Sequence, residues 1–354
     1  MSKLFSIRTP RIHSDNLIAA PWTKIQNPKW VGIVALVVAF ALCGAVAEAQ
    51  QTGKILRIGF LDGSTASGSA VLLDVFRQEL NKLGWVEGKN FTMEYRFADG
   101  KNDRLPELAV ELVRLKVDLI VVRGTPATLG AKSATTSIPI VMAASADPVG
   151  AGLVASLARP GGNVTGLSAL SVELNTKRLE ILKDAVPKLA RVGVLWLAAG
   201  VGSDLQLKEL RPAAAALKLK LEEIESPADA KGLERAFQMA KQRQLGAIMT
   251  TTAAAYFGQR KRIVNLAAKY RLPAIYFQKE FVDEGGLMFY GADYEDLYRK
   301  SAHYVDRILK GTKPADLPVQ QAMKFEFVIS LKAAKQIGLT LSYEFLSRAN
   351  RVIK

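Results

Sequence analysis

The chain is poor in the side chains on which many catalytic and metal sites depend. Its 354 residues include one cysteine, Cys43, and two histidines, His13 and His303. A disulfide framework needs paired cysteines, and a zinc site needs several Cys or His ligands at close spacing, so both are excluded. A histidine-based catalytic dyad has almost no candidates, because His303 falls in the middle of an expected helix. We therefore expect no catalytic residue, no metal and no cofactor.

Nucleotide-binding and nucleic-acid-binding motifs are missing as well. Gly63–Ser69 has the spacing of a phosphate-binding P-loop but lacks its lysine, and no G-x-G-x-x-G or G-x-S-x-G motif follows the strands. Lysine and arginine number 48 against 33 acidic residues, which gives a formal charge of +15. The densest basic run, Arg260–Arg262, opens an expected helix, and no helix-turn-helix precedes the body. We predict no nucleic-acid partner and ascribe the charge to solubility or to weak attraction to anionic surfaces or ligands.

The N-terminal segment has the three-part layout of a secretory signal peptide. Residues 1–29 carry basic side chains and one acidic residue, and Trp30–Ala47 then runs without a charge. The run ends in small residues at Ala-x-Ala spacing, at Ala45–Ala47 or Ala47–Ala49. A basic start, an apolar middle and a small-residue cleavage site predict export, with residues 1–49 removed.

An uncleaved membrane anchor is the alternative, because an apolar run of this length almost spans a bilayer. The Ala-x-Ala ending favours cleavage, and Leu42 stands before Cys43 where a lipoprotein needs a small residue. Cleavage also removes Cys43 and His13, and it lowers the formal charge to +12, because five basic and two acidic residues lie in residues 1–49. We predict a periplasmic protein, which would be membrane-anchored if the segment stayed uncleaved.

From Ile55 onward, apolar strands alternate with helices whose apolar residues recur at helical spacing. Fully apolar strands such as Leu119–Val122 suit a parallel sheet covered on both faces. The patterns predict strands at residues 55–61, 91–97, 119–122, 138–142, 164–167, 191–197, 219–224, 247–251, 274–277, 287–290 and 325–329. They predict helices at residues 72–83, 108–115, 151–157, 175–186, 205–217, 233–243, 260–270, 294–309 and 333–337.

The strand–helix pattern restarts at Arg191–Leu197, which mirrors Ile55–Leu61. Two successive units of roughly 110–120 residues each predict an α/β fold with two doubly wound parallel-sheet lobes joined by a hinge. The C-terminal tail is long enough to cross back between the lobes. The predicted division is a signal peptide at 1–49, a first lobe at 50–168 plus 292–322, and a second lobe at 169–291 plus 323–354.

The loops at the carboxyl ends of the expected strands are rich in Ser, Thr and Gly and poor in acid–base pairs. Ligands of doubly wound sheets bind at these ends. Hydroxyls and the main-chain N–H groups of helix N-termini receive anions such as a carboxylate, which indicates holding a small ligand rather than breaking a bond. For any single loop, ordinary turn and helix-cap chemistry is the alternative. The repetition of the pattern at several strand ends favours the ligand.

Several stretches of the body form a recognisable set. They include Leu83–Asn90 (LGWVEGKN), Asp103–Ala109 (DRLPELA), Asp147–Val154 (DPVGAGLV), Ala158–Gly166 (ARPGGNVTG), Arg178–Lys183 (RLEILK) and Gly285–Met288 (GGLM). With these stretches, residues 56–353 resemble the substrate-binding proteins of ABC transporters that have the type 1 periplasmic-binding fold. Within these, they resemble the family that includes tryptophan- and tyrosine-type binding proteins.

The resemblance implies an extracytoplasmic receptor, not an enzyme, whose two lobes close on a small solute. The solute would be amino-acid-like or aromatic and would carry a carboxylate, and the membrane permease of an ABC importer would be the partner that receives it. The resemblance further implies a set of ligand-binding residues. From the first lobe these are Asp62, Gly63, Ser64, Gly124, Thr125, Pro126, Ser145 and Asp147, and from the second lobe Trp196, Thr251, Thr252 and Phe277.

Two departures from the resembled family affect the second lobe. Similar proteins often carry Asn-Pro after Trp196 and Asp-Pro after the 247–251 strand, whereas this chain has Leu197-Ala198 and Thr251-Thr252. Both changes remove polar or charged groups, so we expect a ligand with less hydrogen-bonding demand there or a shifted specificity. Two other functions stay open: a membrane-anchored sensor with the same body, and an α/β enzyme acting on a small carboxylate or sugar, which the scarcity of His and Cys disfavours.

Overall fold

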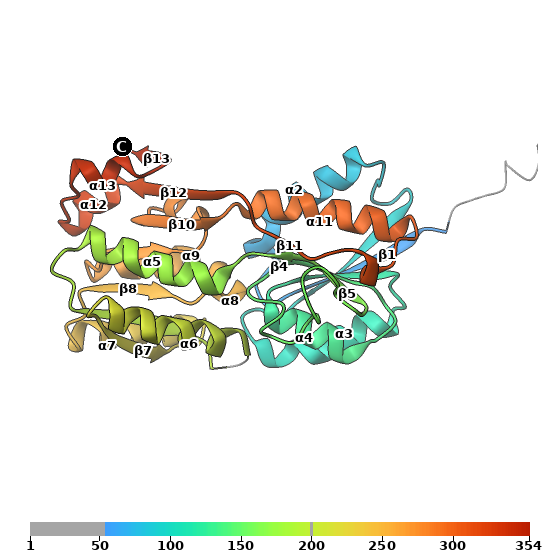
Figure 1. Cartoon of the computed structure of the whole chain (residues 1–354), viewed down its shortest axis with the longest axis horizontal. Helices are drawn as coiled ribbons and strands as arrows, with labels where there is room; N and C mark the ends of the chain where they lie inside the picture. The colour runs from blue at the N-terminus through green and yellow to red at the C-terminus, as the bar shows by residue number, and fades with distance from the viewer. Residues whose placement is uncertain (1–53, 199–200) are drawn as a thin grey trace, which may run out of the picture. The chain divides into compact units, whose positions relative to one another are not determined.

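The computed structural model of the chain describes residues 54–198 and 201–354. The expected signal peptide, including Trp30–Ala47, lies outside the described residues. Within residues 54–198 and 201–354, no helix is both long and apolar enough to cross a membrane. Helices and strands alternate along most of this part of the chain and build two β-sheets (Figure 1).

The first sheet has the order β11-β5-β4-β3-β1-β2, and every neighbouring pair is parallel. Helices α2 and α11 pack on one face, and α3 and α4 on the other. We call this sheet with its four helices the first lobe. Its elements are β1 (Leu56–Asp62), α2 (Ala66–Lys82), β2 (Phe91–Phe97), α3 (Leu105–Arg114), β3 (Leu119–Arg123), α4 (Thr125–Ala134), β4 (Ile140–Ser145), β5 (Val164–Ser168), α11 (Tyr294–Leu309) and β11 (Gln320–Gln321).

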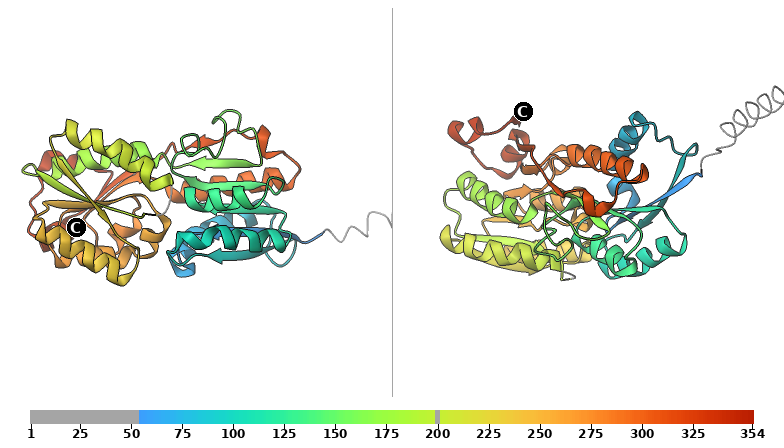
Figure 2. Two further views of the ribbon diagram at one scale, coloured as in Figure 1. Left: turned by 90° about the horizontal axis from the view of Figure 1, so that it is seen from below. Right: turned by 45° about the vertical axis from the view of Figure 1, so that its right-hand side comes forward.

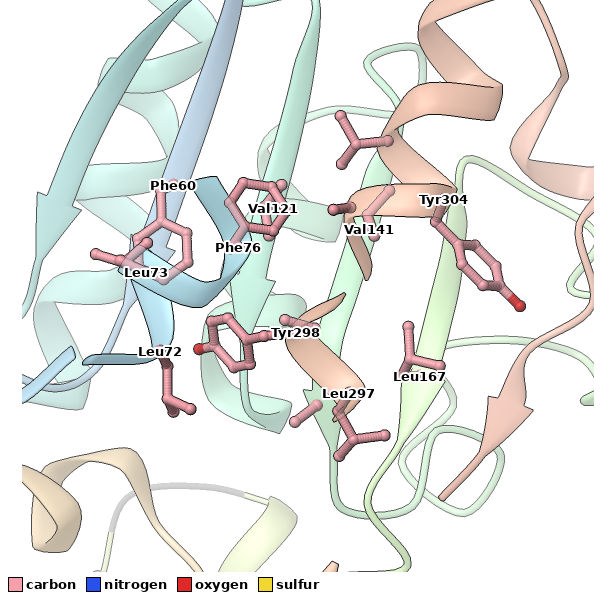
Figure 3. Packing of buried hydrophobic residues seen from close by; sticks show 14 of the residues in the cluster. Phe60, Leu72, Leu73, Phe76, Val121, Val141, Leu167, Leu297, Tyr298 and Tyr304 are labelled. Carbon is pink, nitrogen blue, oxygen red and sulfur yellow. The ribbon is translucent and has the colours of Figure 1, made fainter. Parts of the chain in front are cut away.

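Alternation along the strands divides the core of the first lobe into two layers. Ile58 and Phe60 of β1 face α2 and α11, whereas Leu61 belongs to the cluster formed with α3 and α4. Figure 3 shows side chains from β1, α2, β3, β4, β5 and α11 gathered in the first of these clusters. Helix α11 thus completes this core although five strands of the second sheet precede it in sequence.

The second sheet has the order β13-β12-β10-β9-β8-β6-β7, in which only the β10–β12 pair is antiparallel among the described strands. Its strands are β6 (Arg191–Trp196), β7 (Lys220–Glu225), β8 (Ala247–Thr250), β9 (Ala274–Tyr276), β10 (Met288–Ala292), β12 (Phe325–Ser330) and β13 (Arg351–Ile353).

Helices cover both faces of the second sheet (Figure 2), and we call the whole unit the second lobe. One core cluster includes α5 (Ser171–Ala185), α6 (Val201–Ala216), α12 (Leu331–Ile337) and α13 (Tyr343–Ser347), and the other includes α7 (Ala230–Gln242), α8 (Ala254–Gly258), α9 (Arg260–Lys269) and α10 (Glu280–Asp283). The predicted α/β class with two parallel-dominated sheets is confirmed.

The chain passes between the two sheets after β5, after β10 and after β11. The last two passages lie side by side, because Asp293 N donates a hydrogen bond to Lys324 O at 2.9 Å. The predicted return of the C-terminal tail is therefore confirmed. The residue boundaries predicted for the lobes stay a prediction.

One expected helix is absent, and some helices of the structure were not expected. The helix expected at residues 151–157 is replaced by turns, because Gly152 has a φ of 65° and the Leu153 N–H reaches back to Pro148 O instead of continuing a helix. Helix α4 was not expected, since its small residues give little apolar periodicity. It begins directly after Gly124 and places its first turn at the end of β3.

Candidate ligand-binding cleft

A pocket lies where the carboxyl ends of strands from both sheets meet. The empty space between its lining atoms totals about 630 Å³, part of it open to solvent. The first lobe contributes the ends of β1, β3 and β4 and the start of α11, and the second lobe contributes the ends of β6, β8 and β9 and the starts of α5 and α6. Ligands of doubly wound folds bind at this edge of the sheet.

Among the helices that begin at the pocket, α4, α5 and α6 direct their first turns toward it. Helix α4 follows Gly124, whose φ of 81° lies in the left-handed region that glycine enters without strain, and Pro126 occupies its first turn. Ser171 opens α5, and Gly202 and Ser203 stand in the first turn of α6. First-turn N–H groups have no partner within their own helix, so these starts direct donors and the positive ends of helix dipoles toward the pocket.

Arg123, the last residue of β3, is the charged residue among the described residues that line the pocket, and it is only 3% exposed. Its Nη2 donates to Gln278 Oε1 of the second lobe at 2.8 Å, and its guanidinium lies 4.4 Å from the centroid of the Phe257 ring. Its Nη1 stands 3.5 Å from Asp62 Oδ2 and has no hydrogen-bond partner in the described residues. Arg123 therefore joins the two lobes and keeps one buried donor unused.

Asp62 supports Arg123 from behind the pocket. Its carboxylate accepts hydrogen bonds from the Ser64 N–H at 2.9 Å and from Ser69 Oγ at 2.5 Å, which fixes its orientation. Burial lowers the pKa of Arg123, but the Asp62 carboxylate together with Tyr298, Tyr294 and Glu280 outweighs burial, and the pKa stands above its ordinary value. The arginine is therefore charged at any physiological pH.

A second buried arginine stabilises the second-lobe wall. Arg178 of α5 is 2% exposed; its Nε donates to Tyr290 O at 2.7 Å, and its Nη1 donates to Thr252 Oγ1 at 3.2 Å and to Asn175 Oδ1. Gln206 Oε1 accepts from the Thr252 N–H at 2.6 Å and from Asn175 Nδ2 at 2.5 Å. Burial lowers the pKa of Arg178 to about 10, so it too stays protonated at neutral pH.

Six of the twelve predicted ligand-binding residues line the pocket: Gly63, Gly124, Thr125, Pro126, Thr252 and Phe277. The other six lie behind or beside it. Asp62, Ser64, Ser145 and Thr251 are at most 1% exposed. Ser145 Oγ stands 3.4 Å from Thr125 Oγ1, and Thr251 Oγ1 donates to Leu195 O at 3.4 Å, so both hydroxyls face the protein rather than the pocket.

Asp147 and Trp196 also do not line the pocket. Asp147 accepts a hydrogen bond from the Gly150 N–H at 2.9 Å and so acts as a turn cap, which was the alternative reading of such loops. Trp196 packs into the core of the second lobe with α5 and α6. Alternation along β6 places Trp196 on the same face of the sheet as Val192 and Val194, whereas the main chain continues to the lining residue Leu197.

Residues outside the predicted set also line the pocket, among them Arg123, Ser171, Gln206 and Tyr294. Arg123 had a signal in the sequence, since a charged residue ends the apolar run of β3. Gln206 and Tyr294 had none, because they lie in helices whose place at the pocket is decided by packing.

The lobes are in direct contact beside the pocket. A Cβ on Gly68 of α2 would lie 3.0 Å from Gly258 Cα of α8, and a Cβ on Gly258 would lie 2.7 Å from Ser64 Oγ. A Cβ on Gly202 of α6 would likewise lie 3.2 Å from Thr125 Cβ. Main chains approach this closely only where side chains are absent, so the structure has the lobes closed on the pocket.

Comparison with known proteins assigns the chain to a family. The profile described as "ABC transporter substrate binding protein" matches residues 68–353. The chain belongs to this family. The resemblance inferred from the sequence is therefore confirmed, and the family is one of binding proteins, not a class of enzymes.

Individual relatives agree. A tyrosine-binding protein of Clostridioides difficile (strain R20291) is 30% identical over 272 residues, which is 75% of each chain. A conserved domain protein from Vibrio cholerae is 29% identical with a TM-score of 0.77, covering 84% of this chain and 100% of that one. An ABC domain from Streptococcus pneumonia in complex with L-Trp is 26% identical with a TM-score of 0.75, covering 85% and 100%. These matches confirm the periplasmic-binding-protein-like fold.

The closed arrangement is also visible in the comparisons. The ligand-free, open structure of a substrate-binding protein from Clostridium difficile is 25% identical, and the match covers 85% of this chain and 99% of that one. Its TM-score is nevertheless only 0.58. The L-Trp complex is nearly as identical, at 26%, and scores 0.75. The higher score with the ligand-bound protein agrees with the close contacts between the lobes. Substrate-binding proteins of this family are extracytoplasmic and work with a transporter.

Proposed function

We propose that the protein is the solute-binding component of an ABC importer, which closes its two lobes on a small carboxylate-bearing ligand and delivers it to a membrane permease. The observation that carries the proposal is the pocket lined from both lobes, with Arg123 of the first lobe bonded to Gln278 of the second at its edge. A ligand that contacts both walls stabilises the closed state relative to the open one.

The proposed location is the periplasm, reached through cleavage of the N-terminal segment. The proposed ligand-binding residues are the six predicted residues that line the pocket, with Arg123, Ser171, Gln206 and Tyr294 added to them. The set offers hydroxyl, amide and main-chain N–H donors beside apolar surface, which suits binding and release of an unchanged small molecule.

The test is a thermal-shift screen of the full chain against amino acids, aromatic acids, sugars and purines, with each compound recovered and checked by mass spectrometry. A ligand at 100 times its dissociation constant stabilises the folded state by about 2.7 kcal/mol. We expect a shift for one chemical class with the compound unaltered, and loss of uptake of that compound in cells that lack the protein. Turnover of the compound, or binding without any effect on uptake, would contradict the proposal.

A further inference from the structure

The charged side chains that line the pocket are of one sign. Among the described residues that line it, Arg123 is cationic and none is Asp or Glu. Its Nη1 is buried and lies 3.5 Å from Asp62 Oδ2, so Asp62 compensates its charge from behind the pocket, but no acceptor in the described residues forms a hydrogen bond with it. A buried donor of this kind is costly unless something accepts from it, and a carboxylate oxygen is its strongest acceptor.

The wall behind Thr252 adds a second positive charge. Arg178 has no carboxylate within 4.0 Å in the described part of the chain; its hydrogen bonds go to Tyr290 O, Asn175 and Thr252. Since Thr252 itself lines the pocket, one residue separates this guanidinium from the ligand space. Asp62 compensates the charge of Arg123, whereas that of Arg178 has no such partner, so the surroundings of the pocket keep a net positive charge. In the low dielectric of a closed cleft this charge attracts an anion and repels an ammonium group.

The starts of α4, α5 and α6 add positive potential to that of the arginines. Helices α4 and α5 have no side chain that caps their first N–H groups, and both open at the pocket. The acidic residues in the first turns of α5 and α6, Glu173 and Asp204, are exposed and do not line the pocket. The positive ends of these helices are therefore not neutralised on the pocket side.

The nearby carboxylates do not line the pocket. Asp62 is fully buried and bonded to Ser64 N and Ser69 Oγ, and Asp293 caps α11 by accepting from Asp296 N at 3.0 Å. Glu280 is 8% exposed, and burial raises its pKa. None of the three lines the pocket, so none is placed to bind an α-ammonium group.

We infer that the pocket takes a small monocarboxylic acid with an apolar body and no ammonium group, and not an α-amino acid. The carboxylate lies between Arg123 and the start of α4, and the body lies against Leu197 and Phe277. The inference rests on the proposed solute-binding function and narrows its ligand class. By this inference the chain differs in ligand class from two of its relatives, the tyrosine-binding protein and the ABC domain in complex with L-Trp.

The test compares compounds that differ only in the ammonium group. Titration calorimetry on the full chain would use 3-phenylpropionate with L-phenylalanine, and indole-3-propionate with L-tryptophan, and 3-phenylpropanamide as the uncharged analogue. We expect an acid to bind at least tenfold more tightly than both its amino-acid and its amide counterpart. An amino acid that binds as tightly as its acid would overturn the inference while leaving the solute-binding function intact.

The other outcomes also separate the two proposals. Binding of a sugar or purine from the wider screen, without any acid, would refute the inference and support a solute receptor. No binding in any class would count against both.

A variant tests the charge argument directly. Thr252→Asp places a carboxylate beside Arg178 at the pocket wall, and we expect it to weaken binding of the acid at least tenfold and to improve binding of the amino acid relative to it. Thr252→Asn introduces a neutral side chain of similar size to Asp, and it should lose clearly less affinity for the acid than Thr252→Asp does. Thr136→Asp, in an exposed loop at the opposite end of the first sheet, adds the same charge and should bind as the wild type does. Circular dichroism would check that both Thr252 variants are folded. If the Asp and Asn variants then lose the same affinity for the acid, the role of charge is refuted.

Discussion

Removing the side chain of Gln278 should open the cleft without unfolding either lobe. Gln278 is fully buried, and its Oε1 accepts the hydrogen bond from Arg123 Nη2 at 2.8 Å. Its Nε2 has no partner in the described residues, so Gln278→Ala removes little from the second lobe itself. In the open state Arg123 Nη2 turns to water, whereas in the closed variant it is left buried without an acceptor. The substitution therefore acts on the closed state.

The size of the effect follows from the contact. A hydrogen bond to a charged group contributes about 1.5–3 kcal/mol. At about 1.4 kcal/mol per factor of ten, its loss lowers the ratio of closed to open molecules by roughly 10- to 150-fold. If the ligand binds only the closed state and that state is the minor one without ligand, the dissociation constant rises by the same factor.

The assay is single-molecule energy transfer between dyes on the two lips of the cleft. Cysteines replacing Lys101 and Lys231 would carry the dyes; both lysines are exposed, and the neighbouring Gly100 approaches Ala228 of the second lobe. The variant should populate the open state more at every ligand concentration. Gln242→Ala, an exposed glutamine on α7, is the matched control and should behave as the wild type. An unchanged distance distribution in Gln278→Ala would refute the role assigned to this contact.

Three further predictions concern stability and processing. Gly166→Ala should lower the free energy of unfolding in urea by about 3 kcal/mol, because the φ of Gly166 is 128° and a Cβ would lie 2.3 Å from a main-chain oxygen of β4. Gly162 has open space around it, so the control variant Gly162→Ala should change this free energy by less than about 0.5 kcal/mol. Burial would raise the pKa of Asp296, but two lysine ammonium groups outweigh it and hold the pKa below its ordinary 3.8. The stability that these pairs contribute is thus present above about pH 3.8 and lost as the pH falls through the folded-state pKa; Asp296→Asn should flatten that acid loss, and an unchanged pH profile would contradict it. Intact-mass analysis of the exported protein should find its start after Ala47 or Ala49, and a membrane-bound full-length chain would instead support the anchored sensor.

The strands and most helices could be predicted from local pattern because burial acts on every residue of an element. Leu119–Val122 is apolar throughout, as a strand covered on both faces must be, and the structure places it in the middle of the first sheet. The helix predicted at residues 294–309 matches α11 in both bounds, since its apolar residues repeat at helical spacing. Helix α4 had no such stripe and was missed.

Six of the twelve site residues predicted from the sequence line the pocket. Gly63, Gly124 and Thr252 line the pocket because parallel strands bring their carboxyl ends to one edge, a rule that needs only the order of strands. Whether the side chain at such an end faces the ligand or the core depends on the pleat and on the neighbouring strand. Ser145 and Trp196 therefore could not be told apart from true lining residues.

The sequence by itself determined the α/β class, which follows from periodicity, and the membership of a substrate-binding family, which follows from long matching stretches. Only the tertiary structure decided the charge of the site. Arg123 meets Gln278 across 155 positions of sequence, and Arg178 meets Thr252 across 74. The first contact arises from the packing of the lobes on each other and the second from packing within the second lobe, and no local pattern encodes which distant charge will be buried beside which wall.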